Sequence, residues 1–328
     1  MRSLALAGLG LLGAAALAAQ DARRFEFAEE RMGTIFRVVL YAFDESAARQ
    51  GAAASFSLVA RLDSLFSDYR TDSEIARLGS ASPTEPVSVS TELWTILRIA
   101  QEWSVRTGGA FDVTVGPLSK LWRWAARRGE IPDAARIAAA RAAVGFRRLE
   151  VDPARPVVRF LEPGMALDLG AIAKGFAADA VVAELARRGI RSVLVDAGGD
   201  LALGDSPPGE PGWRIGLPEG GSVVVARVGV ATSGATYRYR EVAGVRYSHV
   251  IDPATDLGVR DAPFVTVIAA DATSADVLAS TLTVLDPEAG RALLRSVEGT
   301  AAKVSGPFGY RTANFPGRRG THLHRANR

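Results

Sequence analysis

The 328-residue sequence contains no cysteine. This absence excludes a disulfide scaffold, a thiolate zinc site, an iron–sulfur cluster, a cysteine nucleophile and a lipid anchor on an N-terminal cysteine. Histidine is scarce as well, because only His249 lies outside the C-terminal tail among the 3 in the chain. His249 is therefore the candidate for a side chain that moves a proton near neutral pH, with a purely structural histidine as the alternative.

Apolar runs that could span a membrane are missing after the N-terminus, since a span needs about 20 apolar residues. At the N-terminus, Arg2 precedes an uncharged stretch, residues 3–19, that ends in small residues. This pattern predicts a signal peptide at 1–19, with an uncleaved membrane anchor as the alternative. We expect an exported bacterial protein, periplasmic or otherwise extracytoplasmic, that is soluble and not lipid-anchored.

A marked excess of one charge is also missing, because 39 basic residues face 36 acidic ones and the net charge is +3. The two signs are interspersed, which argues against nucleic acid as a partner. Only residues 311–328 form a locally basic tail. Hydrophobic residues make up 48% and charged residues 23%, which is typical of a globular protein.

Helical and strand patterns follow one another without strict alternation, a fixed repeat or a long linker, which predicts a single large α+β domain of mixed sheets flanked by helices at 22–310. The expected strands are 34–41, 165–169, 192–195, 213–217, 223–230, 237–242 and 265–269. The expected helices run from the cap Asp44 to Phe66, from the cap Ser90 to Gly108, twice within 118–144, and over 173–188, 274–285 and 287–296.

Two glycine-containing segments carry candidate binding residues. In 107–117, paired glycines would let the backbone approach a ligand beside Phe111 and Asp112, although a helix stop explains the glycines equally well. In 168–176, a glycine turn after Asp168 opens a helix that carries Lys174. That arrangement favours a phosphate, but it is neither a Walker loop nor a dinucleotide fingerprint, and a structural turn is the alternative.

Two more segments combine glycine with polar side chains. The double glycine in 196–200 lies between Asp196 and Asp200, which makes a binding edge a candidate beside a simple turn. The segment 231–234 and the later 247–253, which contains His249 and Val250, form the fourth candidate.

The fifth segment is the expected helix at 274–285. Asp276 and Ser280 are four residues apart there, so a carboxylate and a hydroxyl share one helix face. Magnesium suits such a pair, because it keeps waters and takes further oxygens from substrate phosphates. The alternative is that Asp276 interacts only with the helix dipole.

In this order, the segments resemble the ApbE-type FAD:protein FMN transferases. The similarity extends from Arg31-Met32-Gly33-Thr34, through Ser67-Asp68-Tyr69 and Ser73-Glu74, to the helix that carries Asp276. It implies a T-fold-related domain and an enzyme that uses Mg²⁺ and FAD, attaches FMN through a phosphoester to a threonine or serine of an acceptor flavoprotein, and releases AMP.

The resemblance also implies roles for particular residues. The catalytic residues would be His249 and Asp276, and the metal ligands would be Ala171, through its backbone oxygen, Asp276 and Ser280. The flavin site would comprise Met32, Tyr69, Ala110, Phe111, Asp112, Asp168, Lys174, His249 and Val250.

The sequence departs from the family pattern at three positions. Ser280, with Thr281 beside it, stands where threonine is usual, Asp196 where asparagine is common, and Asp256 where a glycine closes the turn. FAD pyrophosphatase activity, giving FMN and AMP, and FAD binding without turnover remain alternatives. Residues 233–236 resemble the acceptor motif, which makes Thr236 a weak candidate for self-modification.

Overall fold

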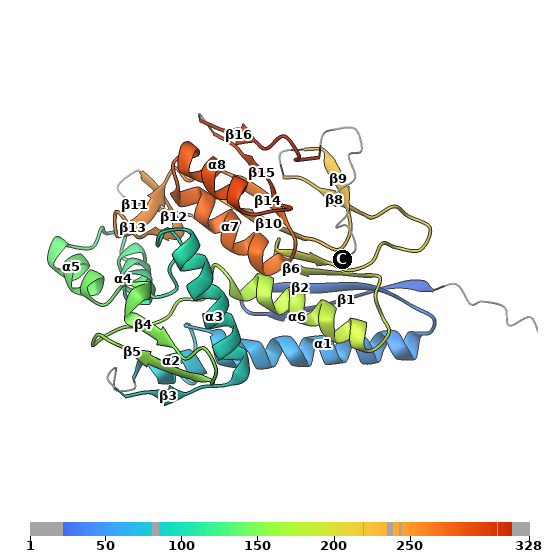
Figure 1. Cartoon of the computed structure of the whole chain (residues 1–328), viewed down its shortest axis with the longest axis horizontal. Coiled ribbons are helices and arrows are strands. Elements are labelled where there is room, and N and C mark those ends of the chain that lie inside the picture. The colour runs from blue at the N-terminus through green and yellow to red at the C-terminus, as the bar shows by residue number, and fades with distance from the viewer. Residues whose placement is uncertain are drawn as a thin grey trace, which may run out of the picture.

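An eight-stranded antiparallel sheet forms the centre of the described part of the chain (Figure 1). The computed structural model describes residues 22–80, 85–218, 220–234, 239–242, 245–306 and 308–316, so the expected signal peptide, Thr236 and most of the basic tail lie outside it. In spatial order the strands are β1 (Arg23–Arg31), β2 (Thr34–Ala42), β6 (Val193–Ala197), β7 (Leu201–Leu203), β10 (Gly229–Ser233), β14 (Val265–Ala269), β15 (Ala301–Val304) and β16 (Tyr310–Arg311).

Alternation along the strands gives this sheet two apolar faces. In β2, Val38 and Leu40 belong to the main core, whereas Val39 between them belongs to a second cluster. The second cluster is closed by the hairpin of β8 (Trp213–Gly216) and β9 (Ser222–Val225), which contributes Trp213. Both faces of the sheet are thus covered.

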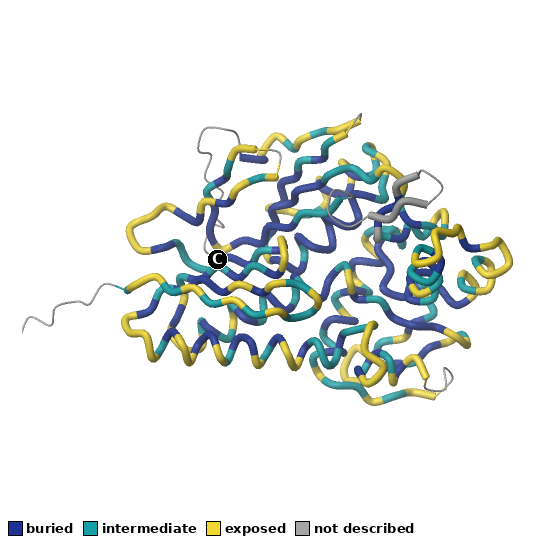
Figure 2. The backbone as a smooth tube through the Cα atoms, turned by 180° about the vertical axis from the view of Figure 1, so that it is seen from behind, coloured by how far each residue is buried: buried dark blue, intermediate teal, exposed yellow. Residues whose placement is uncertain are grey.

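Three helices cover the main-core face: α1 (Glu45–Phe66), α6 (Ala173–Arg187) and α7 (Ala272–Val284). Asp44 caps α1 by accepting from the backbone N–H of Ala47, as its position in the sequence predicts. Along α1, buried and exposed positions alternate with the helical period (Figure 2), so its apolar face lies against the sheet. By contrast, α7 is buried almost all round, between α6 and strands β10 and β14.

Most of the remaining elements form a lobe at the end of the helix layer (Figure 1). Its packing includes a small apolar cluster in which Trp122 meets Tyr247 edge-on, at 4.9 Å between ring centroids. Its helices are α2 (Glu74–Gly79), α3 (Thr91–Arg106), α4 (Gly116–Ala126), α5 (Ala134–Ala142) and the 3₁₀ turn η1 (Phe146–Arg148). Its strands are β3 (Val87–Ser88), β4 (Leu149–Val151), β5 (Val157–Phe160), β11 (Tyr239–Val242), β12 (Val245–Asp252) and β13 (Leu257–Arg260). Outside this lobe, α8 (Pro287–Ser296) follows α7.

The α+β class, the expected helices and five of the seven expected strands agree with the structure, whereas α2 and several short strands were not expected. Two expected strands were wrong. Residues 165–169 form only an isolated bridge, between Ala166 and Val115, because their hydrogen bonds go to a loop. The run 223–230 divides into β9 and β10, since Arg227 adopts a positive φ of 55° and breaks the strand.

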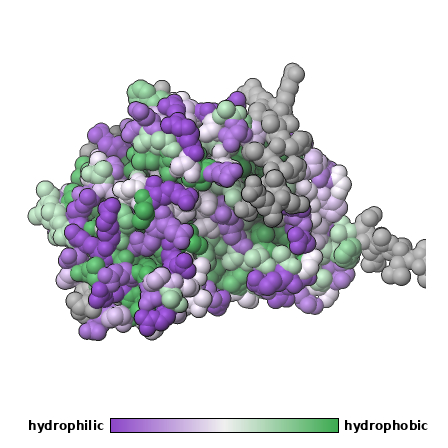
Figure 3. Space-filling view, viewed as in Figure 1, coloured by the Kyte–Doolittle hydropathy of each residue, from purple (hydrophilic) through white to green (hydrophobic). Residues whose placement is uncertain are grey.

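Polar and apolar residues intermingle on the face shown in Figure 3. Among the described residues, none of the helices combines the length and the apolar character that a membrane crossing requires.

Candidate active site

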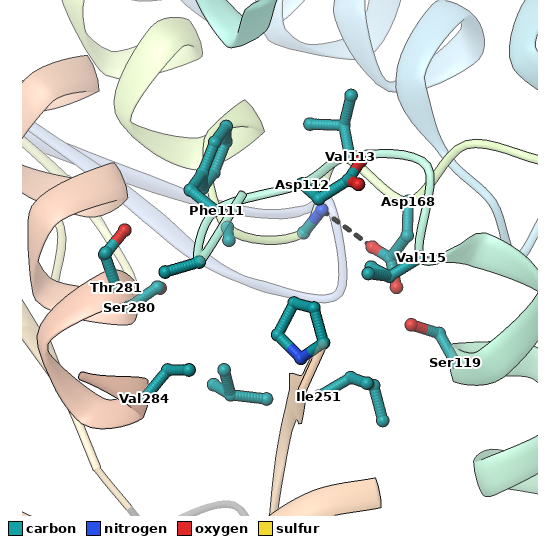
Figure 4. A pocket seen from close by; sticks show the side chains of 15 residues that line it. Phe111, Asp112, Val113, Val115, Ser119, Asp168, Ile251, Ser280, Thr281 and Val284 are labelled. Carbon is teal, nitrogen blue, oxygen red and sulfur yellow. Dashed lines mark hydrogen bonds between the residues drawn. The ribbon is translucent and has the colours of Figure 1, made fainter. Parts of the chain in front are cut away.

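A pocket lies where α4, α7 and β12 approach the loops that precede α4 and α6 (Figure 4). Ser280, Thr281 and Val284 project from α7 on one side, and Ser119 projects from α4 on the other. The pocket has a cavity volume of about 90 Å³, and it opens into a wider hollow of about 610 Å³. It is lined by Ala110, Phe111, Asp112, Val113, Val115, Ser119, Asp168, Gly170, Ala171, Val250, Ile251, Pro253, Ser280, Thr281 and Val284.

The lining unites four of the five segments singled out in the sequence. Seven predicted site residues line the pocket together: Ala110, Phe111, Asp112, Asp168, Ala171, Val250 and Ser280. They are as far apart in the chain as Ala110 and Ser280, so only tertiary packing brings them to one place.

The first loop of the pocket follows α3 and is organised by Asp112. The buried Asp112 carboxylate accepts from the Thr114 N–H (2.7 Å), the Thr114 hydroxyl (2.6 Å) and the Phe146 N–H (2.9 Å). Burial raises the pKa of Asp112, and these hydrogen bonds act against that rise. Asp112 therefore shapes the loop with its carboxylate oxygens, a role that a helix stop alone did not predict.

The second loop contains Asp168 and leads into α6. Asp168 ties it to the first loop, because its backbone N–H donates to the Val113 carbonyl at 2.8 Å. Its side chain accepts from the Gly170 N–H at 2.9 Å, the dashed line in Figure 4. No side chain caps the N-terminus of α6 at Ile172. The N–H groups of Ile172 and Ala173 instead donate to the Leu169 carbonyl, at 3.1 and 2.8 Å.

Another N–H group in the first turn of α6 has its acceptor on α7. Gly175 donates to the Asp276 carboxylate at 3.1 Å. Gly175 is required at this crossing, since a Cβ there would lie 2.3 Å from the carbonyl oxygen of Ala272. The helices therefore pack backbone to backbone, and Asp276 lies between them with 4% exposure.

Asp276 is outside the pocket lining, one helical turn before Ser280. Ser280 is 8% exposed and its hydroxyl makes no hydrogen bond within the described residues, whereas the Thr281 hydroxyl donates to the Val277 carbonyl at 2.7 Å. In the described part of the chain, no three His, Cys, Asp or Glu side chains converge on one point. A metal here would need backbone and water oxygens in addition to Asp276 and Ser280, a set that suits magnesium.

Asp179 was missed by the sequence analysis. From α6 it caps the N-terminus of α7, accepting from the N–H groups of Ala272 (2.9 Å) and Thr273 (2.8 Å) and from the Thr273 hydroxyl (2.6 Å). Burial raises the pKa of Asp179 to about 6, against those hydrogen bonds. No local pattern in α6 indicates this role, because its partners are more than ninety positions away.

Three predicted flavin-site residues lie outside the pocket lining. Met32 occupies the β1–β2 turn with φ 49° and packs against the main core. Lys174 forms a salt bridge with the buried Asp200, so its charge is already matched. Tyr69 is 78% exposed, and the guanidinium carbon of Arg123 lies 4.5 Å from its ring centroid.

His249 belongs to β12, but its side chain lies outside what the structure describes. Its neighbours Val250 and Ile251 line the pocket. The segment 118–144, in which the sequence showed no site chemistry, contributes Ser119 to the lining and Arg123 next to it on the same helix face. In the sequence, Ser119 and Arg123 were marked only by their spacing of four residues, which places them on one helix face.

Comparison with known proteins assigns the chain to a family. The model of the ApbE family matches residues 32–304. The chain belongs to the ApbE family. This ApbE chain is 34% identical over 320 residues to a FAD:protein FMN transferase of Treponema pallidum, covering 90% of this chain and 87% of the relative. It is 32% identical over 288 residues to one of Klebsiella pneumoniae, covering 85% and 88%.

Solved ApbE structures share this architecture over most of the chain. The apo form of the Pseudomonas stutzeri flavinyl transferase ApbE superposes with a TM-score of 0.78 at 31% identity, covering 89% of this chain and 96% of that one. The flavin transferase ApbE of Vibrio cholerae gives a TM-score of 0.77 at 28% identity, covering 89% and 98%. The single α+β domain expected from the sequence is therefore confirmed.

Proposed function

We propose that this chain is a Mg²⁺-dependent FAD:protein FMN transferase that attaches FMN to a threonine or serine hydroxyl of an acceptor flavoprotein. Relatives across most of its length carry that transferase name. The observation that carries the proposal is the pocket itself, in which the Phe111 loop, the Asp168 loop and Ser280 face one space. The rest of the proposal concerns what each residue does there.

The flavin site consists of the pocket residues together with residues at its rim. Phe111 offers an apolar ring, and Ala110, Asp112, Asp168 and Val250 shape the walls. The exposed Tyr69 adds a stacking surface beyond Asp168. Met32 and Lys174 act at a distance from the lining, Met32 through the turn it occupies and Lys174 through its pairing with Asp200.

The residues present fit a magnesium ion. Asp276 would supply the anionic ligand, the Ser280 hydroxyl would supply a second oxygen, and Ala171 at the pocket would supply a backbone oxygen. When bound, the ion would neutralise the diphosphate of FAD and stabilise the AMP that leaves.

The covalent step is a displacement at phosphorus. The acceptor hydroxyl oxygen forms a bond to the FMN phosphorus, and the phosphoanhydride bond to AMP breaks. His249 takes the proton of the attacking hydroxyl. Such a reaction needs positioning and charge neutralisation more than covalent help, and the two hydrogen-bonded loops provide a fixed frame.

The same proposal includes export, with 1–19 as a signal peptide, 22–310 as the transferase domain and 311–328 as a basic tail. The acceptor would then be an extracytoplasmic flavoprotein. Cell fractionation tests this part, since a full-length precursor retained in the cytoplasm would contradict it.

The decisive experiment incubates the enzyme and a candidate acceptor with FAD and Mg²⁺ and measures the acceptor mass. The expected result is an acceptor that gains FMN, with one AMP released for each FMN attached. AMP and free FMN without acceptor modification would indicate a pyrophosphatase, and tight FAD binding without AMP would indicate a binding protein. Either result, with several acceptors tried, contradicts the proposal.

Variants of α7 test the metal site. Asp276→Asn keeps an oxygen that accepts from Gly175 but removes the charge, so metal-dependent turnover should fall at least about a hundredfold. Ser280→Ala should raise the Mg²⁺ concentration needed for half-maximal activity. Ser274→Ala, the same change on the same helix outside the pocket lining, is the matched control and should behave like the unmodified enzyme.

A further inference from the structure

The strongest feature outside the assigned residues is a charged cluster at the rim of the pocket, centred on Arg123. Its guanidinium forms a salt bridge with Asp68 and lies 3.9 Å from the carboxylate of Asp168. The same group stacks on the ring of Tyr69, 4.5 Å from its centroid. One cation thus touches three side chains from two distant segments.

This cluster is continuous with the pocket. Asp168 lines the pocket directly, and Ser119, which also lines it, precedes Arg123 by one turn of α4. Figure 4 shows Ser119 and Asp168 on the same side of the space, opposite the side chains of α7. Arg123 therefore joins the pocket wall to Tyr69.

The environment of Tyr69 is unusual for an aromatic residue. Tyr69 is 78% exposed to solvent, although the Arg123 guanidinium covers one face of its ring. The opposite face is consequently open to solvent, at a place where a planar ring can stack. A cation on the first face restricts the rotation of the tyrosine side chain. Less conformational entropy of this side chain is therefore lost when a ligand stacks on the other face.

The charges in the cluster depend on Arg123. Asp68 is half-buried, with 9% of its side chain exposed. Burial together with the nearby charge of Asp168 raises its pKa, while Arg123 and, more weakly, Lys120 act in the opposite direction. Without the guanidinium, two carboxylates would face each other at the pocket rim. Asp168 would then lose a partner that orients it beside Gly170.

We propose that Arg123 is a positioning residue that fixes Tyr69 as a stacking wall for a ring of FAD and ties that wall to Asp168 at the pocket. This inference rests on the proposed function, because it assigns FAD to the pocket. Arg123 touches neither the phosphorus nor the acceptor hydroxyl in this scheme. Its effect is on how well the substrate binds, and the bond-breaking step is left almost unchanged.

A double-mutant cycle on FAD binding tests the proposal. The Kd for FAD is measured by flavin fluorescence. We expect Arg123→Met and Tyr69→Ala each to raise this Kd by roughly tenfold. The double variant should bind FAD no more weakly than either single variant. In the transfer assay, Arg123→Met should raise KM by a similar factor with kcat within about threefold. Arg123→Lys, which keeps the charge but not the planar fork, should lie between.

Competition with FMN and with AMP then identifies the stacked ring. Arg123→Met should weaken the binding of one of these half-molecules through Tyr69, FMN for the isoalloxazine and AMP for the adenine. Weakening of neither would overturn the proposal.

Controls separate positioning from a structural role. Arg128→Met removes the same kind of stacking, of Arg128 on Trp124 at 4.2 Å, away from the pocket, and should leave FAD binding and transfer unchanged. If Arg123→Met folds poorly because Asp68 is left unpaired, the cycle is repeated with Asp68→Asn in every variant.

An unchanged Kd for FAD in Arg123→Met overturns the inference. So does a double variant whose increase in Kd is the product of the increases in the two single variants. Failure of the proposed function gives a different result. An enzyme that binds FAD but transfers no FMN contradicts the transferase, while the binding cycle still decides the role of Arg123.

Discussion

The half-buried carboxylate of Asp179 should make the stability of this protein fall as the pH rises from weakly acidic to neutral. Burial raises its pKa from the ordinary 3.8 to about 6, although three donors at the start of α7 act against the rise. Because the pKa of Asp179 is higher in the folded state, the folded protein binds this proton more tightly than the unfolded protein does. The stabilisation is fully present below the unfolded pKa of 3.8 and is lost as the pH passes through about 6.

The size of the effect follows from the same two values. The difference between 3.8 and about 6 corresponds to at most about 3 kcal/mol. The side chain keeps some contact with solvent in a hollow of about 300 Å³ between α6 and β7, so the measured change should be smaller than this limit.

The assay compares the unmodified protein with Asp179→Asn, which cannot titrate. Free energies of unfolding from denaturant curves are measured from about pH 4 to about pH 7. The other carboxyl groups titrate alike in both proteins, so the difference between them isolates Asp179. We expect the unmodified protein to lose stability relative to the variant as the pH rises. A difference that stays constant over this range would refute the assignment.

Three further changes test the packing beneath the pocket, each by denaturant unfolding. Lys174→Met leaves the buried Asp200 carboxylate without its partner and should lower the free energy of unfolding by about 3 kcal/mol. Adding Asp200→Asn should restore most of that stability. A single variant as stable as the unmodified protein would contradict the pairing. Gly175→Ala should lower the free energy of unfolding by roughly 1–3 kcal/mol and reduce metal-dependent turnover, because the new methyl group meets the Ala272 carbonyl. Asp112→Ala leaves three donors without an acceptor and should lower it by about 3 kcal/mol, so that unchanged stability would show the carboxylate to be dispensable to the loop.

The elements whose signals are local were predicted well from the sequence. Asp44 and Ser90 cap the helices they were expected to cap, and the helix that holds Asp276 and Ser280 forms with both on one face. The expected strand at 165–169 was wrong, because an apolar run of five residues does not reveal whether a neighbouring strand or a loop takes its hydrogen bonds.

The candidate site was predicted in part. The glycine-rich loops and Ser280 line one pocket, whereas Lys174 pairs with Asp200 and Asp112 accepts hydrogen bonds within its own loop and from Phe146. A sequence indicates which side chains carry charge, but their partners depend on how segments far apart in the chain pack.

The sequence by itself determined the α+β class, the family and the set of chemically capable residues, because caps, apolar periodicity and ordered motifs are properties of short segments. Only the tertiary structure decided which of those residues share a pocket, that Gly175 allows α6 and α7 to pack backbone to backbone, and which groups Asp179 and Arg123 contact. The physical reason is that hydrogen bonds and ion pairs act over a few ångströms, so their partners are fixed by packing and not by distance along the chain.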